Sequence, residues 1–284
     1  MDFIKRNSLL YKTGVEYGDY TINHIEGCSH GCTYPCYAMR MSYRFGRIKS
    51  YSDWLKPKLV ENALELLQEE IPKLKSKIRS VHLCFMSDPF MHSHNEVAEM
   101  SLKIIKLLNI NGIKVTTLTK GIYPRNLFEF AINPVNEYGI TLVSLNPNFQ
   151  RKFEPFSAKW FQRVRSLERL SGKGAKTWVS MEPYPTPNII KQNLGQILDR
   201  VAFTNRIVFG RLNYNSNSTK YADHVKFYND LCFQVLEFCQ KNGIACHIKK
   251  GTYTRPDFAM ADSDLKLVHQ IYLNVPNDAV SAIR

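Results

Sequence analysis

The sequence alternates short runs rich in β-branched and aromatic residues with longer amphipathic segments, and this order limits the fold more than any other feature. Strands are predicted over residues 20–26, 80–85, 114–119, 140–145, 176–181 and 206–212, with a weaker seventh pattern over 245–250. Between them, apolar residues recur at spacings of three and four over residues 59–71, 97–109, 158–170, 193–202 and 224–242. Strands and helices in alternation predict a parallel sheet with right-handed crossovers.

The number of strand and helix units predicts an incomplete barrel. Six or seven units are fewer than the eight of a closed TIM barrel, so we expect an α/β fold with a partial (β/α)6-type TIM barrel. We expect a single domain over residues 1–284, with a core over about 18–250 and a closing helix and tail over 251–284. In such a barrel the loops after the strands form the active site.

Polar and chemically reactive residues follow the predicted strands one after another. In chain order they are Cys28, Ser87, Asp88, Lys120, Asn146, Glu182 and Asn213. Because the carboxyl ends of parallel strands meet at one edge of a sheet, we expect these side chains to share one pocket.

Charge and hydropathy indicate the kind of partner. Lys and Arg number 38 against 25 Asp and Glu, which gives a formal net charge of +13. Such a field attracts nucleic acid, an anionic cofactor or an anionic surface. No run of about 18 apolar residues is present to span a membrane, and the first residues lack the apolar stretch of a signal peptide. We therefore expect a cytoplasmic protein with no membrane partner.

Cysteine usage indicates a metal or redox centre. The chain has seven cysteines, an odd number, and three of them fall within nine residues at Cys28, Cys32 and Cys36. This pattern does not match an extracellular disulfide framework. The other cysteines lie among apolar neighbours and are predicted to be small buried hydrophobes; they are Cys84, Cys232, Cys239 and Cys246.

Two kinds of centre fit three closely spaced thiols. A [4Fe-4S] cluster held by three cysteines leaves one iron open to an external ligand. A zinc ion would instead take a fourth ligand from His24 or His30. The thiols alone leave both alternatives open.

The segment GCSHGCTYPCYA at residues 27–38 resembles the GCxHxCxYCYA signature of the radical S-adenosylmethionine (SAM) superfamily, in the branch related to spore photoproduct lyase. Tyr34 matches the aromatic residue after the second cysteine. The signature has two residues between its last two cysteines, whereas this chain has three, with Pro35 as the extra one. The variant Cx3Cx3C spacing, together with a Glu-Pro pair after the fifth strand, separates this chain from the lyase itself, and we do not assign photoproduct repair to it.

Further motifs of that branch follow in the same order. FMSDPF at 85–90 is similar to its TDPY turn, LTKG at 118–121 to the end of its third strand, and VSLN at 143–146 with FEPF at 153–156 to its fourth strand and the Glu-Pro that follows. The resemblance implies cofactor contacts from Tyr34, Ser87, Asp88, Lys120, Ser144 and Asn146. Glu182 and Arg211 follow the next two strands and are expected to contact SAM or substrate.

The resemblance also implies an activity. Cys28, Cys32 and Cys36 would hold a [4Fe-4S] cluster that cleaves bound SAM to a 5′-deoxyadenosyl radical, which abstracts hydrogen from a substrate. A flavodoxin or ferredoxin is the expected electron donor. Cys84 is a candidate catalytic residue, because a thiol near the cavity can return a hydrogen atom to a substrate radical.

One segment favours nucleic acid as the substrate. Residues 37–60 carry six basic side chains and one acid, Asp53, interleaved with aromatic rings. This composition suits a single-stranded or flipped nucleotide, although a solvated loop with snorkelling stems has the same composition. The alternatives are a non-catalytic or zinc-bearing nucleic-acid-binding protein on the same barrel, and a radical enzyme that acts on a peptide or small metabolite.

Overall fold

The computed structural model describes residues 1–254, and its main element is an eight-stranded sheet with the order β11-β10-β9-β8-β7-β6-β3-β2. Seven strands run parallel: β3 (Tyr20–Ile22), β6 (Ser80–Leu83), β7 (Lys114–Thr119), β8 (Glu137–Thr141), β9 (Lys176–Tyr184), β10 (Arg206–Arg211) and β11 (Ala245–Ile248). Only β2 (Leu10–Lys12) is antiparallel, to β3.

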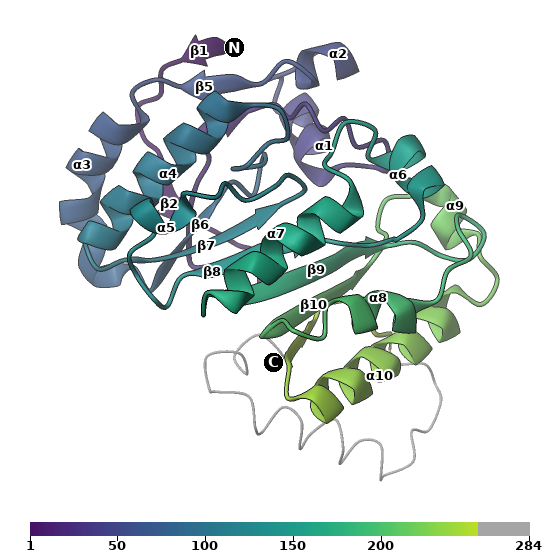
Figure 1. Cartoon of the computed structure of the whole chain (residues 1–284). Helices are drawn as coiled ribbons and strands as arrows, with labels where there is room; N and C mark the ends of the chain where they lie inside the picture. The colour runs from purple at the N-terminus through teal and green to yellow at the C-terminus, as the bar shows by residue number, and fades with distance from the viewer. Residues whose placement is uncertain (255–284) are drawn as a thin grey trace.

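Helices connect successive parallel strands along the outer side of this sheet (Figure 1). They are α3 (Ala63–Leu74), α4 (Asn95–Ile110), α5 (Leu127–Phe130), α7 (Trp160–Gly172), α8 (Leu194–Arg200) and α10 (His224–Asn242), with the 3-10 turn η1 (Lys75–Lys77) after α3. The order gives six strand and helix units followed by a seventh parallel strand. The predicted partial (β/α)6-type barrel is confirmed.

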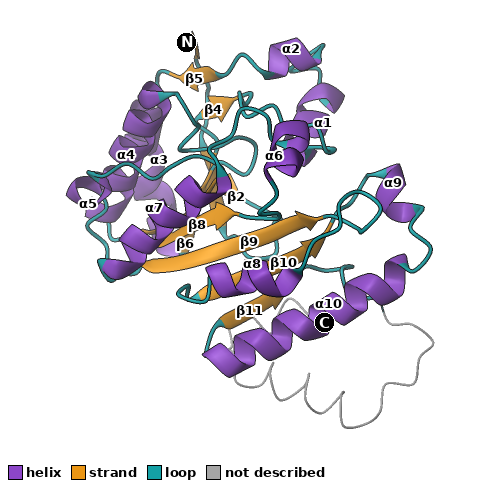
Figure 2. Cartoon of the chain, turned by 45° about the vertical axis from the view of Figure 1, so that its right-hand side comes forward, coloured by secondary structure: helices purple, strands orange, loops and turns teal. Residues whose placement is uncertain are grey.

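Shorter elements cover the end of the barrel toward which the strands point. Figure 2 shows α9 (Ser216–Thr219) beyond the tips of β9 and β10, and α1 (Tyr37–Arg44) and α6 (Pro147–Phe153) above the sheet. The helix α2 (Tyr51–Trp54) lies near a second, three-stranded sheet of β1 (Asp2–Ile4), β5 (Lys58–Val60) and β4 (Ile25–Glu26). This end therefore carries the loops that an active site requires.

The core fixes the positions of the strand ends. Helix α4 buries the residues that recur on one face of it: Val97, Ser101, Ile104, Ile105 and Leu108. Ile104, Ile105 and Leu108 pack with the strands in one large apolar cluster, whereas Val97 packs in a smaller cluster with Cys84 and Met91. Each such aliphatic side chain contributes about 1.5–3 kcal/mol when fully buried, so the barrel wall is a rigid support for the loops above it.

Some boundaries differ from the prediction, for local reasons. The strand predicted over 20–26 is divided into β3 and β4, because residues 20–22 pair with β6 whereas residues 25–26 pair with β5 in the second sheet. The strand predicted over 80–85 ends at Leu83, because Cys84 has a φ of +65°. The predicted closing helix and tail lie largely at 255–284, outside the described residues. No helix within residues 1–254 is long and apolar enough to cross a membrane.

Candidate active site at the ends of the strands

A cavity of about 500 Å³ opens at the carboxyl ends of the parallel strands. Its wall includes all three clustered cysteines, Cys28, Cys32 and Cys36. Six further residues at strand ends also line it: Glu182 and Arg211 lie in the last residues of β9 and β10, and Ser87, Asp88, Lys120 and Asn213 follow β6, β7 and β10. The structure thus brings these residues into one pocket, as the strand-end argument predicts, while the role of each stays a prediction.

The cysteine loop is held in place by groups other than its thiols. Gly27 has a φ of +83°, and a Cβ there would lie 2.9 Å from the carbonyl oxygen of Trp54. The next residue, Cys28, donates its backbone N–H to that same carbonyl at 2.9 Å. Tyr51 donates its hydroxyl to the carbonyl of Gly31 at 2.7 Å. The loop therefore has a defined path before any ligand binds.

The three thiols are free, and their surroundings favour a cationic partner. None of them is in a disulfide. Burial raises the pKa of Cys28, and the nearby Asp88 carboxylate raises it further. Burial raises the pKa of Cys32 to about 12, against the lowering effect of the Lys120 ammonium. Thiolates at these positions need compensating positive charge, which a bound iron-sulfur cluster provides, so the donor set fits that group.

His30, inside the cysteine loop, has both ring nitrogens engaged by the protein. Its Nδ1 lies 3.4 Å from Oδ2 of Asp88, and its Nε2 accepts the backbone N–H of His92 at 2.9 Å. Burial lowers the pKa of His30 to about 4, so the ring is neutral at pH 7 with its proton on Nδ1. The imidazole therefore connects the cysteine loop to Asp88.

His24 is engaged in the same way. The Ser101 hydroxyl donates to the carbonyl of Pro89 at 2.5 Å, so it accepts from Nε2 of His24 at 2.8 Å. The other ring nitrogen, Nδ1, is then the acceptor for the Cys84 thiol at 3.4 Å. Neither histidine has a nitrogen left for zinc, and within residues 1–254 no three His, Cys, Asp or Glu side chains are arranged to hold a single metal ion.

Asp88 joins the ends of two neighbouring strands. Its Oδ1 accepts from the Thr119 hydroxyl at 2.6 Å and from the backbone N–H of Phe90 at 2.9 Å. Its Oδ2 accepts from the backbone N–H of Lys120 at 2.7 Å. The adjacent Ser87 donates its hydroxyl to the carbonyl of Gly27. These bonds fix the turn after β6 against both the cysteine loop and the end of β7.

A buried carboxylate, Glu154, organises the neighbouring wall. It accepts from the Tyr34 hydroxyl at 2.8 Å and from Nη2 of Arg163 at 2.6 Å. Although burial alone would raise it, the charges of Arg163 and Lys120 hold the pKa of Glu154 below its ordinary value. The Lys120 ammonium lies 3.9 Å from Glu154 and 5.5 Å from the centre of the Tyr34 ring. The Lys120 ammonium thus lies at the cavity wall, beside Glu154 and the Tyr34 ring.

Two of the predicted cofactor residues lie elsewhere. Ser144 accepts the backbone N–H of Asn146 at 3.1 Å, and Asn146 accepts the backbone N–H of Asn148 at 2.8 Å at the start of α6. Both side chains shape the turn between β8 and α6, and neither is among the residues that line the cavity. Their contact with SAM remains a prediction without support from this geometry.

The cavity wall also contains residues that sequence reasoning missed. Glu16 and Tyr17, from the loop between β2 and β3, and Lys249, directly after β11, line it together with Glu182. The Tyr17 ring packs edge-on against Trp178, with their centroids 5.7 Å apart. Burial raises the pKa of Glu182, and the Lys249 ammonium opposes that effect. No local pattern marks the segment 13–19, because its partners come from distant strands.

Arg211 is held by residues that follow it in the chain. Its Nε donates to the side-chain oxygen of Asn213 at 2.9 Å. The backbone N–H of Arg211 donates to the hydroxyl of Thr252 at 3.3 Å. The guanidinium is therefore oriented along the cavity wall by the loop that follows β10.

Similar proteins agree with this arrangement. The sequence model of the radical SAM superfamily matches residues 22–201. An uncharacterized protein of Methanocaldococcus jannaschii is 26% identical over 217 residues, which cover 75% of this chain and 78% of that protein. An uncharacterized protein of Mycobacterium tuberculosis is 26% identical over 189 residues, or 64% of this chain and 55% of the relative.

Solved structures show the same fold. Spore photoproduct lyase complexed with dinucleoside spore photoproduct has a TM-score of 0.62 at 14% identity, over 86% of this chain and 80% of that one. A mutant of the lyase with bound AdoMet has a TM-score of 0.62 at 12% identity, over 88% and 81%. Because the superfamily model covers more than half of the sequence, including the cysteine loop and the ends of β6 to β9, this chain belongs to the radical SAM superfamily of enzymes.

Proposed function

We propose that the chain holds a [4Fe-4S] cluster on Cys28, Cys32 and Cys36 and binds SAM beside it. One observation carries the proposal: three unpaired thiols line the same cavity as Asp88 and Lys120, which follow adjacent strands. When bound, the cluster supplies an electron that cleaves SAM to methionine and a 5′-deoxyadenosyl radical, which abstracts hydrogen from the substrate.

The protein's own residues position the reactants. Lys120 presents an ammonium to the SAM carboxylate from between Tyr34 and Glu154. Asp88 holds the turn after β6 in a fixed shape, so that its backbone faces the cavity. On the opposite wall, Glu182 and Arg211 are available to the ribose or to the substrate.

Cys84 is the proposed hydrogen-atom donor. Its thiol lines the cavity, is 4% exposed, and donates to Nδ1 of His24, so it is protonated. As a substrate C–H bond forms, the S–H bond breaks and a thiyl radical is left on Cys84. One electron from a flavodoxin or ferredoxin and one proton then restore the thiol.

Nucleic acid is the proposed substrate class. The formal charge of +13 favours a polyanion, and residues 37–52 contain basic and aromatic side chains with no acid. A spore photoproduct lyase of the same fold is described in complex with a dinucleoside photoproduct. A peptide or small-metabolite substrate is the alternative that a binding experiment must exclude.

Anaerobic reconstitution tests the proposed cofactor chemistry. We expect about four iron and four sulfide per chain, an EPR spectrum that changes when SAM is added, and release of 5′-deoxyadenosine under reduction. Cys36→Ala should lose the iron, whereas the matched control Cys232→Ala, on α10, should keep it. Tight zinc binding with no iron would overturn the proposal.

A further inference from the structure

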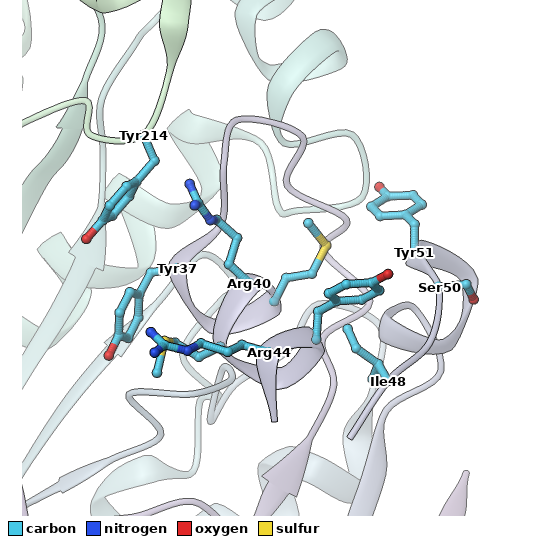
Figure 3. A pocket seen from close by; sticks show the side chains of 10 residues that line it. Tyr37, Arg40, Arg44, Ile48, Ser50, Tyr51 and Tyr214 are labelled. Atoms are coloured by element: carbon cyan, nitrogen blue, oxygen red, sulfur yellow. The ribbon is translucent and has the colours of Figure 1, made fainter. Parts of the chain in front are cut away.

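A second hollow lies on the outer surface, beside the mouth of the active-site cavity. It has a volume of about 440 Å³ and is formed mainly by α1 and the residues that follow it. We call it the α1 groove; its lining includes Tyr37, Arg40, Tyr43, Arg44, Tyr51 and Tyr214. Figure 3 shows the Arg40 side chain extending from α1 toward the Tyr214 ring, which comes from the loop after β10.

The α1 groove is continuous with the cavity. Tyr37 and Tyr214 line both of them. Tyr37 directly follows Cys36, and Tyr214 directly follows Asn213. A chain-like ligand lying in the groove therefore passes the two tyrosines before it reaches the thiols.

The charge of the groove is positive: two of its lining residues are cations, Arg40 and Arg44, and none is an Asp or Glu. The segment 37–52 also contains Arg47 and Lys49 outside the groove lining, and it has no acid. The first acid after them, Asp53, accepts the backbone N–H groups of Lys49 and Ser50, so its carboxylate is engaged in capping α2. Guanidinium groups in this setting are suited to phosphate.

Three tyrosine side chains of the groove are largely exposed to solvent. Tyr37, Tyr43 and Tyr214 are 54%, 63% and 63% exposed. Tyr214 has a φ of +59°, in the left-handed region that residues other than glycine rarely adopt and that is found at ligand clamps. The Arg40 guanidinium lies 4.5 Å from the centre of the Tyr214 ring. The exposed Tyr214 ring therefore lies next to the Arg40 guanidinium. Such a ring can stack on a base, and the neighbouring cation can bind the phosphate.

We infer that the α1 groove binds a single-stranded nucleic-acid segment, with phosphates at Arg40 and Arg44 and an unpaired base stacked on Tyr214. The neighbouring nucleotide then enters the cavity between Tyr214 and Tyr37, where Arg211 faces it. A duplex does not fit this description, because its bases are already stacked on one another. The inference rests on the proposed function and names the surface and the form of its substrate.

Fluorescence anisotropy of the reconstituted full chain tests the inference. The probes are labelled single strands of DNA and RNA of about 12 nucleotides and a duplex of the same sequence. We expect the single strands to bind more tightly than the duplex. Tyr214→Ala should weaken binding roughly five- to 100-fold, whereas Tyr214→Phe, which keeps the ring, should not.

The cations are tested by salt dependence. Arg44→Gln should reduce the slope of log Kd against log salt by about 1, because one phosphate contact is lost. The matched control is Lys103→Gln, a change of an exposed cation on α4, which should leave the slope unchanged. Unfolding curves for each variant establish that it is folded.

The outcomes separate this inference from the proposed function. If iron binding and SAM cleavage hold but Tyr214→Ala binds as tightly as the wild type, the groove is not the strand site and the inference is wrong. Equal competition by polyglutamate would also overturn it, because the surface would then be a general polyanion patch. If strand binding depends on Tyr214 while no iron is retained, the cofactor proposal fails and the binding surface stands.

Discussion

Nε2 of His247 lies 3.0 Å from Oε2 of Glu16, although the two residues are 231 positions apart in the sequence. Glu16 also accepts the backbone N–H of Lys250 at 3.1 Å and lies 3.6 Å from the Lys249 ammonium. The contact joins the loop between β2 and β3 to the end of β11. Because β2 and β11 are the two end strands of the eight-stranded sheet, the Glu16 carboxylate links its two edges.

Replacing this carboxylate should destabilise the fold in a pH-dependent way. Burial alone would raise the pKa of Glu16, but Lys250 and Lys249 hold it below its ordinary value of 4.5. Because the folded pKa is lowered, the stabilisation is present above about pH 4.5 and is lost as the pH falls toward the folded value. We expect Glu16→Gln to lower the free energy of unfolding by about 1 kcal/mol at pH 7, since solvent partly screens the pair.

Urea denaturation at pH 7, 5 and 3.5, all near room temperature, measures this difference. The gap between wild type and Glu16→Gln should be similar at about pH 7 and 5 and should narrow below 4.5. Glu69→Gln, an exposed change on α3, is the control. A gap that widens on acidification would contradict the assignment.

The Glu154 carboxylate should matter more for stability than the hydrogen bond that Tyr34 donates to it. Glu154→Gln leaves the buried guanidinium of Arg163 without its counter-charge, and breaking a buried pair in this way costs about 3–5 kcal/mol. Tyr34→Phe removes one hydrogen bond from the same carboxylate and should cost about 1 kcal/mol. Chemical denaturation of the two apoprotein variants measures the loss in free energy of unfolding for each. Equal losses would show that the buried Arg163 guanidinium does not need the negative charge of Glu154.

Cys84→Ser tests the hydrogen-donor role without removing the hydrogen bond to His24. A hydroxyl donates to the imidazole as the thiol does, but its O–H bond is too strong to give up a hydrogen atom to a carbon radical. We expect the variant to retain iron and to release 5′-deoxyadenosine, while the product that requires hydrogen return falls. In deuterated water the wild-type product should take up deuterium through the exchangeable thiol. Uptake that persists in Cys84→Ser would assign the role to another residue.

The Tyr17 ring should contribute to stability through its edge-on contacts. Its centroid is 5.9 Å from that of Phe85 and 5.9 Å from that of His247, in addition to its contact with Trp178. Tyr17→Ala removes all of them and should cost about 3 kcal/mol. Tyr17→Phe keeps the ring and should cost less than about 1 kcal/mol. Thermal unfolding compares the two, with the exposed Tyr43→Ala as a control expected to change stability little.

The sequence predicts those parts of the fold whose pattern is local. The strand over 114–119 and the helix over 224–242 have the predicted bounds, because each is a continuous periodic run. The pocket residues that directly follow strands were also predictable, since the geometry of a parallel sheet places strand ends together. Lys120 is an example, at the end of β7.

Other parts of the site depend on contacts between distant segments. Glu16 and Tyr17 have no pattern that marks them, and they reach the cavity only because β11 lies where the loop between β2 and β3 crosses it. His24 lies in a predicted strand, yet its ring is fixed by Ser101 from α4. The roles of such residues follow from tertiary packing, which periodicity does not encode.

The anchoring of the cysteine loop has a consequence for the order of assembly. Backbone bonds from Cys28 to Trp54 and from Thr33 to Phe153, with the hydroxyl of Tyr51 on Gly31, use no sulfur atom. The polypeptide is therefore expected to reach its native form first and to take up iron and sulfide afterwards. Iron and sulfide must then be delivered to a protein that is already folded. If oxygen destroys the cluster, the remaining apoprotein can bind a new cluster without refolding.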